Sequence, residues 1–134
     1  MAISKERKNQ LIVWADDVIR HSGIYNQMTR EIVSESYNGQ IAAFSVSVAL
    51  SGLKPAIALY YSGKGSSDVD KKEIIKLLAA MYSKEIGNQK SADQFFQQVI
   101  AAKDNALADL QKTIIEYGIA LKLAVRTFKL KGNE

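Results

Sequence analysis

Apolar residues recur along this chain at spacings of three and four, which is the pattern of amphipathic helices packed on a common core. No segment alternates with a period of two for long enough to require a strand. The first run follows Ser4, whose hydroxyl group is placed to cap the amides of a first turn. A first helix is therefore predicted from about Ser4 to just before His21. Its predicted apolar side consists of Leu11, Trp14, Ala15, Val18 and Ile19.

A second helix is predicted over residues 26–51, which again carry apolar side chains at helical spacing. Gly39 lies inside it and should cost about 1 kcal/mol relative to alanine, so its presence indicates close packing. A break follows near Pro55, since proline is tolerated only in a first helical turn. A short helix is then predicted over residues 54–61, before the glycine- and serine-rich loop of residues 62–67.

The second half of the chain carries clear signals for helix starts and ends. Ser67 precedes two acidic residues and predicts a helix start, and Gly87 suits the left-handed end of that helix. Ser91 and Gln94 form a capping box, after which apolar residues continue at spacings of four and three. This stripe predicts one long helix, or two helices bent near Asp104 or Gly118. Its positions are Phe96, Ile100, Lys103, Leu107, Leu110, Ile114, Tyr117, Leu121, Ala124 and Phe128.

The expected fold is therefore an all-α bundle of about five to six helices, formed by residues 1–134 as a single domain. The chain is 47% hydrophobic and 24% charged, as ordinary globular proteins are. It contains only one proline, so long helices can form without interruption. It contains no cysteine, which excludes disulfides and agrees with a reducing compartment. The start lacks the apolar run of a secretory signal, and no stretch reaches the ~20 apolar residues of a membrane span. We expect a cytoplasmic protein without a membrane segment.

The residue types needed for catalysis are sparse. His21 is the single histidine and lies at a helix end, where it complements the helix dipole without an evident nucleophile nearby. The segment 63–66 resembles a phosphate-binding loop, but a glycine follows its lysine where that motif requires serine or threonine. Paired carboxylates such as Glu31 and Glu35 usually form a solvated surface. The sequence therefore predicts no enzymatic activity, no metal and no cofactor.

The net charge of +4 and the isoelectric point of about 9.2 favour an acidic partner, most commonly nucleic acid. Lys122, Arg126 and Lys129 are four and three residues apart and should share one face of the final helix, although cations there also complement the helix dipole. Candidate nucleic-acid-binding residues are Lys54, Lys64, Lys71, Lys72, Lys122, Arg126 and Lys129. Among the aromatic residues, Phe96, Tyr117 and Phe128 are expected in the core, whereas Tyr60 or Tyr61 is the better candidate for exposure.

Two stretches resemble the small helical subunit of the type III-B CRISPR effector complex. The first is an apolar helix that ends in Gly52-Leu53 and is followed by a short apolar-aromatic helix and the loop lysine Lys64. The second comprises Tyr117, the pair Ala120-Leu121 and the basic-aromatic tail of residues 125–129. The resemblance covers residues 25–131, and the small subunit of type III-A complexes is a close rival.

This resemblance implies a non-catalytic subunit in antiviral defence. Such subunits stack along the effector filament, contact its other subunits and help to hold the guide and target RNA. The alternative is a helical protein-interaction module without nucleic-acid binding. It would use an apolar seam such as the one through Leu107, Leu110, Ile114 and Leu121.

Overall fold

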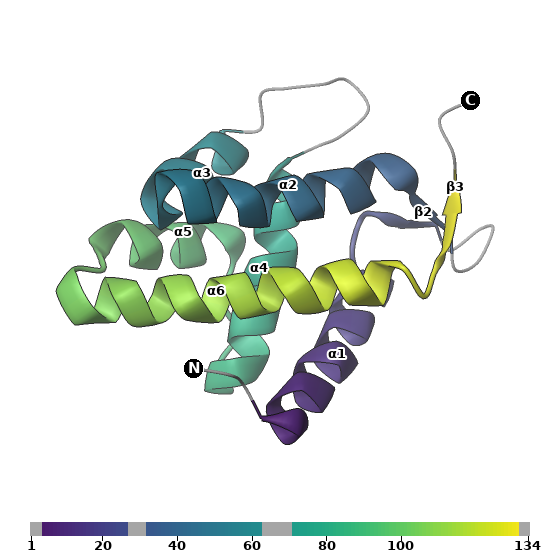
Figure 1. Ribbon diagram of the computed structural model, residues 1–134, viewed down its shortest axis with the longest axis horizontal. Coiled ribbons are helices and arrows are strands. Elements are labelled where there is room, and N and C mark those ends of the chain that lie inside the picture. Colours follow the sequence, from purple (N-terminus) through teal and green to yellow (C-terminus); the bar gives the residue numbers. More distant parts are fainter. Residues whose placement is uncertain (1–3, 27–31, 63–70, 132–134) are drawn as a thin grey trace.

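The computed structural model describes residues 4–26, 32–62 and 71–131. Within them the chain forms six helices and three strands of two or three residues (Figure 1). The predicted all-α bundle is confirmed. The helices are α1 (Lys5–Arg20), α2 (Glu35–Ser51), α3 (Leu53–Tyr61), α4 (Lys72–Ile86), α5 (Ala92–Ala101) and α6 (Asp104–Val125).

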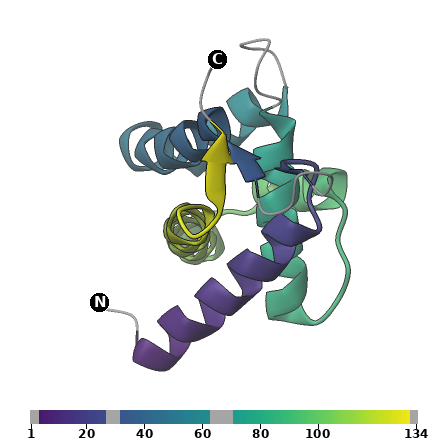
Figure 2. The ribbon, with the colours of Figure 1, turned by 90° about the vertical axis from the view of Figure 1, so that its right-hand side faces the viewer.

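The helices pack in two layers with α1 across one side. α2 and α6 lie side by side and run in opposite directions, and α4 crosses behind them (Figure 1). In the view turned by 90°, α2 and α6 lie on one side and α4 and α5 on the other, and α1 runs diagonally below α6 toward α4 (Figure 2). α1 contacts α6 and α4, so it closes the open side of the core. None of the described helices is long and apolar enough to cross a membrane.

Local sequence signals placed several helix ends correctly. Ser4 caps α1 by accepting a hydrogen bond from the amide of Arg7 at 3.1 Å. Ser91 and Gln94 form the predicted capping box of α5, and Gly87 ends α4 with φ at 68°. The predicted start at Ser67 lies outside the described residues. These signals succeed because each cap depends only on residues within one turn of it.

Buried side chains from all six helices form one core. Gly118 lies inside α6, where a Cβ atom would stand 2.4 Å from Oγ of Ser45 in α2. Glycine therefore permits the close approach of α2 and α6 at this point. At Gly39 a Cβ atom would meet nothing within 4 Å, so the predicted close packing there is wrong. The largest fully buried side chains include Tyr117, Phe44, Phe95, Leu11, Ile19 and Ile41.

The predicted second helix begins later than expected because a small sheet occupies its amino-terminal part. Strand β1 (Tyr25–Asn26) pairs antiparallel with β2 (Ile32–Ser34), and β2 pairs parallel with β3 (Lys129–Lys131). Val33 is buried, and Tyr25 packs edge-on against Phe128 with ring centroids 5.8 Å apart. One of the two backbone partners of β2, β3, is almost a hundred residues away, so helical spacing alone gave the wrong assignment.

The long carboxy-terminal stripe divides into two helices near Asp104, one of the two predicted places. Ala102 and Lys103 have extended backbones, and Asp104 has φ at 54°. This break changes the buried face, so Phe95 and Val99 are buried in α5 where Phe96 and Ile100 were predicted. In α6 the prediction holds. Its buried stripe residues are Ile114, Tyr117, Leu121 and Ala124.

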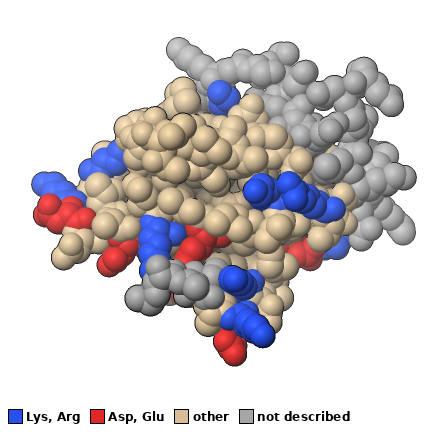
Figure 3. All heavy atoms as spheres, viewed as in Figure 1, with Lys and Arg blue, Asp and Glu red and all other residues tan. Residues whose placement is uncertain are grey.

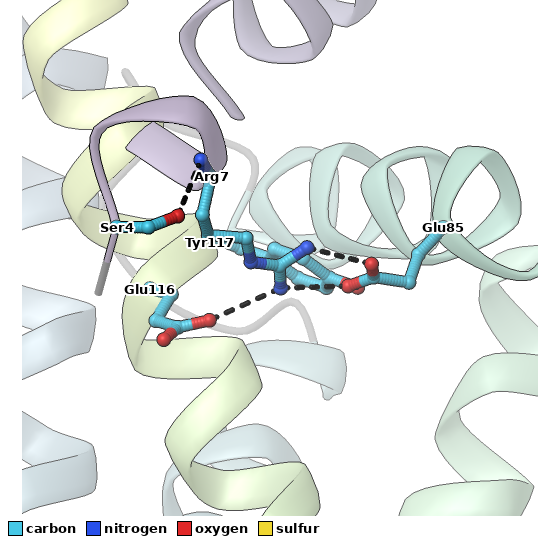
Figure 4. A network of polar contacts seen from close by, with 5 residues as sticks. All are labelled: Ser4, Arg7, Glu85, Glu116 and Tyr117. Carbon is cyan, nitrogen blue, oxygen red and sulfur yellow. Dashed lines mark hydrogen bonds and ion pairs between the residues drawn. The ribbon is translucent and has the colours of Figure 1, made fainter. Parts of the chain in front are cut away.

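A polar network joins α1, α4 and α6 (Figure 4). Both terminal guanidinium nitrogens of Arg7 donate to Glu85, at 2.6 and 2.8 Å, and one also donates to Glu116 at 3.1 Å. The buried Tyr117 hydroxyl donates to Glu85 at 2.8 Å. The hydrogen bond from Arg7 holds the pKa of Glu85 below its usual range, whereas burial and the same carboxylate raise the pKa of Tyr117. The network therefore fixes the orientation of α1 on α6.

Candidate nucleic-acid interface

For two of the seven candidate cations, the structure does not describe a side chain that is free at the surface. Lys54 is half-buried in α3, and its ammonium group donates a 2.7 Å hydrogen bond to the carbonyl oxygen of Ile100 in α5. This contact ties α3 to α5 at the start of the short helix. Lys64 lies outside the described residues, so its predicted role remains a prediction.

Lys71 and Lys72 lie at the start of α4 and face aromatic rings. The ammonium nitrogen of Lys71 lies 5.3 Å from the ring centroid of Tyr60, and that of Lys72 lies 4.7 Å from the centroid of Tyr61. Tyr60 is buried, so its predicted candidacy for exposure is wrong; Tyr61 is half-buried and stacks on Phe96 at 4.1 Å. Tyr61 therefore has Phe96 and Lys72 as ring neighbours, and neither tyrosine offers an unpartnered ring to a base.

The three cations predicted to share one face of the final helix are separated by the end of that helix. α6 ends at Val125, and Arg126 follows as its cap with helical dihedral angles. The backbone of Lys129 belongs to β3, which pairs with β2. Lys122 and Arg126 stay one turn apart, whereas the predicted place of Lys129 on the same helical face is wrong because the chain has already turned into the sheet.

The outward side of α6 carries a stripe of cations and apolar residues. Its positions follow at spacings of three and four, which keeps them on one face of the helix. Ile119 is 48% exposed, and Arg126 is exposed beside the half-buried Lys122. No ion pair joins Lys112, Lys122 or Arg126 to an acidic side chain within residues 4–26, 32–62 and 71–131. The stripe consists of Lys112, Ile115, Ile119, Lys122 and Arg126.

A groove of about 1020 Å³ lies between this side of α6 and α1. Lys8 of α1 and Lys112 of α6 both line it, and neither has an acidic partner in the part of the chain that the structure describes. Figure 3 shows blue atoms over the carboxyl half of α6 and over the lower part of α1, with tan surface between them. We call Lys8, Lys112, Lys122 and Arg126 the basic face.

Four cations elsewhere are engaged by acidic side chains, while Lys54 contacts a carbonyl oxygen and Lys71 and Lys72 contact aromatic rings. The pairs are Arg7 with Glu85 and Glu116, Arg20 with Asp16, Lys76 with Glu73, and Lys84 with Asp17. Besides the basic face, the cations with no described partner for their side chains are Lys5, Lys90 and Lys103. The cations without any described side-chain partner therefore lie mainly on α1 and α6, where a polyanion would replace bound counterions.

His21 lies at the carboxyl end of α1, as predicted. Its Nδ1 atom lies 2.9 Å from the carbonyl oxygen of Asp17 and 3.4 Å from the carboxylate of the same residue. Lys84 hydrogen-bonds that carboxylate and lowers the pKa of Asp17. Within the described ranges, no three His, Asp or Glu side chains gather as a metal site would require. Glu31 lies outside those ranges.

Sequence reasoning missed Lys112, and it interpreted the cluster of Lys5, Arg7 and Lys8, which Glu6 interrupts, as a solvated surface. Lys112 precedes Glu116 by four residues, a spacing that predicts a neutralising pair within the helix. In the fold Glu116 instead accepts a hydrogen bond from Arg7 of α1, which leaves Lys112 without that partner. A signal was available for Lys122 and Arg126, since no acidic residue lies three or four positions from either one.

The basic face thus combines cations without acidic partners with a groove of exposed apolar residues. Such a surface can hold phosphate groups by charge and can cover apolar side chains of a partner. Comparison with protein-family models, with curated proteins and with solved structures gives no match for this chain.

Proposed function

We propose that this chain is a non-catalytic, RNA-contacting small subunit of a type III CRISPR effector complex in antiviral defence. The observation that carries the RNA-binding part is the basic face, where four cations have no acidic partner among the described residues. The resemblance of residues 51–64 and 117–129 to the small helical subunits supports the choice of complex. Guide and target RNA, other subunits of the complex and further copies of the chain along the filament are the expected partners, in the cytoplasm.

Charge without base-reading groups favours contacts to the phosphate backbone. Lysine and arginine side chains on a rigid helix position a nucleic acid without reading its sequence. Single-stranded RNA releases counterions when it binds, so four phosphate contacts give a slope of log affinity against log salt of about −3. The expected binding is therefore weak, independent of sequence and strongly weakened by salt.

The test is fluorescence anisotropy of a labelled single-stranded RNA titrated with the chain at several salt concentrations. Affinity that falls with salt at the expected slope, and that is equal for unrelated sequences, supports backbone binding. Affinity that does not change with salt would remove the basic face from the proposal. Co-purification of the chain with the other subunits of a type III effector complex tests the choice of complex separately.

The second candidate is a helical protein-interaction module without RNA binding. The predicted seam does not support it as such, because Ile114 and Leu121 are buried in the core. Other apolar residues are exposed instead: Leu50 of α2 is 82% exposed, and Leu59 of α3 is 52% exposed. The upper part of Figure 3, over α2 and α3, is largely without charge. A specific protein partner that binds equally well with and without RNA would favour this candidate.

A further inference from the structure

The groove between α1 and α6 has the length of a short helix. Its lining residues on α6 extend from Asp104 to Leu123, a span of about 28 Å at the helical rise of 1.5 Å per residue. α1 lines the groove only at Lys8, Leu11 and Ile12, a span of about 6 Å, so α6 alone bounds the rest of its length. The groove has a volume of about 1020 Å³. These dimensions suit an elongated occupant of about five helical turns better than a compact small molecule.

The middle of the groove is apolar. Ile119 and Leu123 of α6 are 48% and 46% exposed, and Ile12 of α1 and Ile115 of α6 line the same groove. Phosphate groups do not cover such side chains, so a nucleic-acid backbone on the basic face leaves them in water. An amphipathic helix can cover them, because its apolar residues recur at the helical spacing that also separates Ile115, Ile119 and Leu123 on α6.

The charges beside the groove determine which charge its occupant should carry. Lys8 on α1 and Lys112 on α6 have no acidic partner among the described residues. Glu116 also lines the groove, and its carboxylate shares the guanidinium group of Arg7 with Glu85. Asp104 lies at the amino-terminal end of α6, about 12 Å along the helix from Lys112. Lys122 and Arg126 follow on the same face of α6 as Ile119, so the cations around the apolar middle outnumber the acidic groups.

We infer that the groove between α1 and α6 binds an amphipathic helix of a partner protein that carries acidic residues beside its apolar face. The exposed apolar residues in the middle of the groove, which RNA binding does not need, carry this inference. It therefore goes beyond the proposed function, although the two share Lys8 and Lys112. RNA and this helix would approach neighbouring parts of one face.

The probe is a displayed library of 18-residue helical peptides with leucines fixed at helical spacing and all flanking positions randomised. Peptides are selected on the full chain, and those that also bind an I119S/L123S variant are removed. Both substituted side chains are about half exposed, so the variant should keep its fold, which circular dichroism checks. We expect the surviving peptides to carry Asp and Glu in clear excess over Lys and Arg at the flanking positions.

The affinity of a synthetic peptide with the selected consensus sequence is then measured for variants of the apolar residues and of the cations. I119S/L123S should weaken its binding at least tenfold, and K8E/K112E about three- to tenfold, as expected for exposed ion pairs. K90E/K103E has the same change in net charge as K8E/K112E and should leave binding within about twofold. K122E/R126E should lower RNA affinity while peptide affinity stays within about threefold, which separates this inference from the proposed function.

Four outcomes would overturn the inference. One is a selection that enriches no peptide dependent on Ile119 and Leu123. Another is a set of selected peptides with no acidic excess. The third is a consensus peptide whose affinity is unchanged in K8E/K112E. Loss of binding in V46S/L50S instead of I119S/L123S would place the partner on α2 and would equally exclude the groove.

Discussion

The hydroxyl group of Tyr117 donates a 2.8 Å hydrogen bond to the carboxylate of Glu85, deep between α6 and α4. The same carboxylate accepts hydrogen bonds from both terminal nitrogens of Arg7 in α1 (Figure 4). One acidic side chain thus holds three helices together. Because α1 forms one wall of the groove and carries Lys8, this network also sets the geometry of the basic face.

Removing the Tyr117 hydroxyl should destabilise the fold. Y117F keeps the buried ring but leaves Glu85 without one donor, and a hydrogen bond to a charged group contributes about 1.5–3 kcal/mol. Since Glu85 is partly exposed, we expect a loss of about 1–2 kcal/mol in the free energy of unfolding, measured by urea denaturation. The control is Y61F, which loses a hydrogen bond to Asp93 in an exposed position and should change stability less. Equal losses of stability in Y117F and Y61F would contradict the role of this network in holding the three helices together.

The contribution of Glu85 should depend on pH. Its pKa is lowered in the folded state, chiefly by Arg7, so its stabilising effect is complete above the usual carboxyl pKa of about 4.5. The effect is lost as the pH falls through the lowered pKa. The wild type should therefore be more stable than E85Q at pH 7, and the difference should shrink steadily below about pH 4.5. Unfolding midpoints at pH 7, 5, 4 and 3 measure it.

The control for this pH series is E6Q, because Glu6 is exposed in the first turn of α1. The difference between wild type and E6Q should vary much less with pH. A difference between wild type and E85Q that stays constant from pH 7 to pH 3 would contradict the role of the ionised Glu85.

Helix ends could be predicted from the sequence, whereas the sheet and half of the basic face could not. Ser4 and Ser91 act on amides three residues away, so the local sequence contains both partners. β2 depends on β3 at the other end of the chain. Lys112 loses its expected helical partner only because α1 brings Arg7 to Glu116. Tertiary packing therefore creates the unpaired charge that propensity and spacing do not indicate.

The contact between Gly118 and Ser45 should appear as an energetic coupling. In G118A the new methyl group meets Oγ of Ser45, whereas S45A/G118A removes that oxygen and keeps the better helix former. We expect the double variant to be more stable than G118A by about 1 kcal/mol. S45A alone should be nearly neutral. A double-mutant cycle of urea denaturation gives the coupling, and additive effects would mean that α2 and α6 do not meet at this point.

The most direct test of the basic face compares two double variants with equal net charge. K122E/R126E reverses two cations of that face, and K90E/K103E reverses two cations without described partners outside it. Their affinities for one labelled single-stranded RNA are measured by fluorescence anisotropy across a series of salt concentrations. K122E/R126E should bind about tenfold more weakly, with a salt slope smaller in magnitude by about 1.4, while K90E/K103E stays near the wild type. Equal losses in the two variants, or no loss in either, would contradict RNA binding through the basic face.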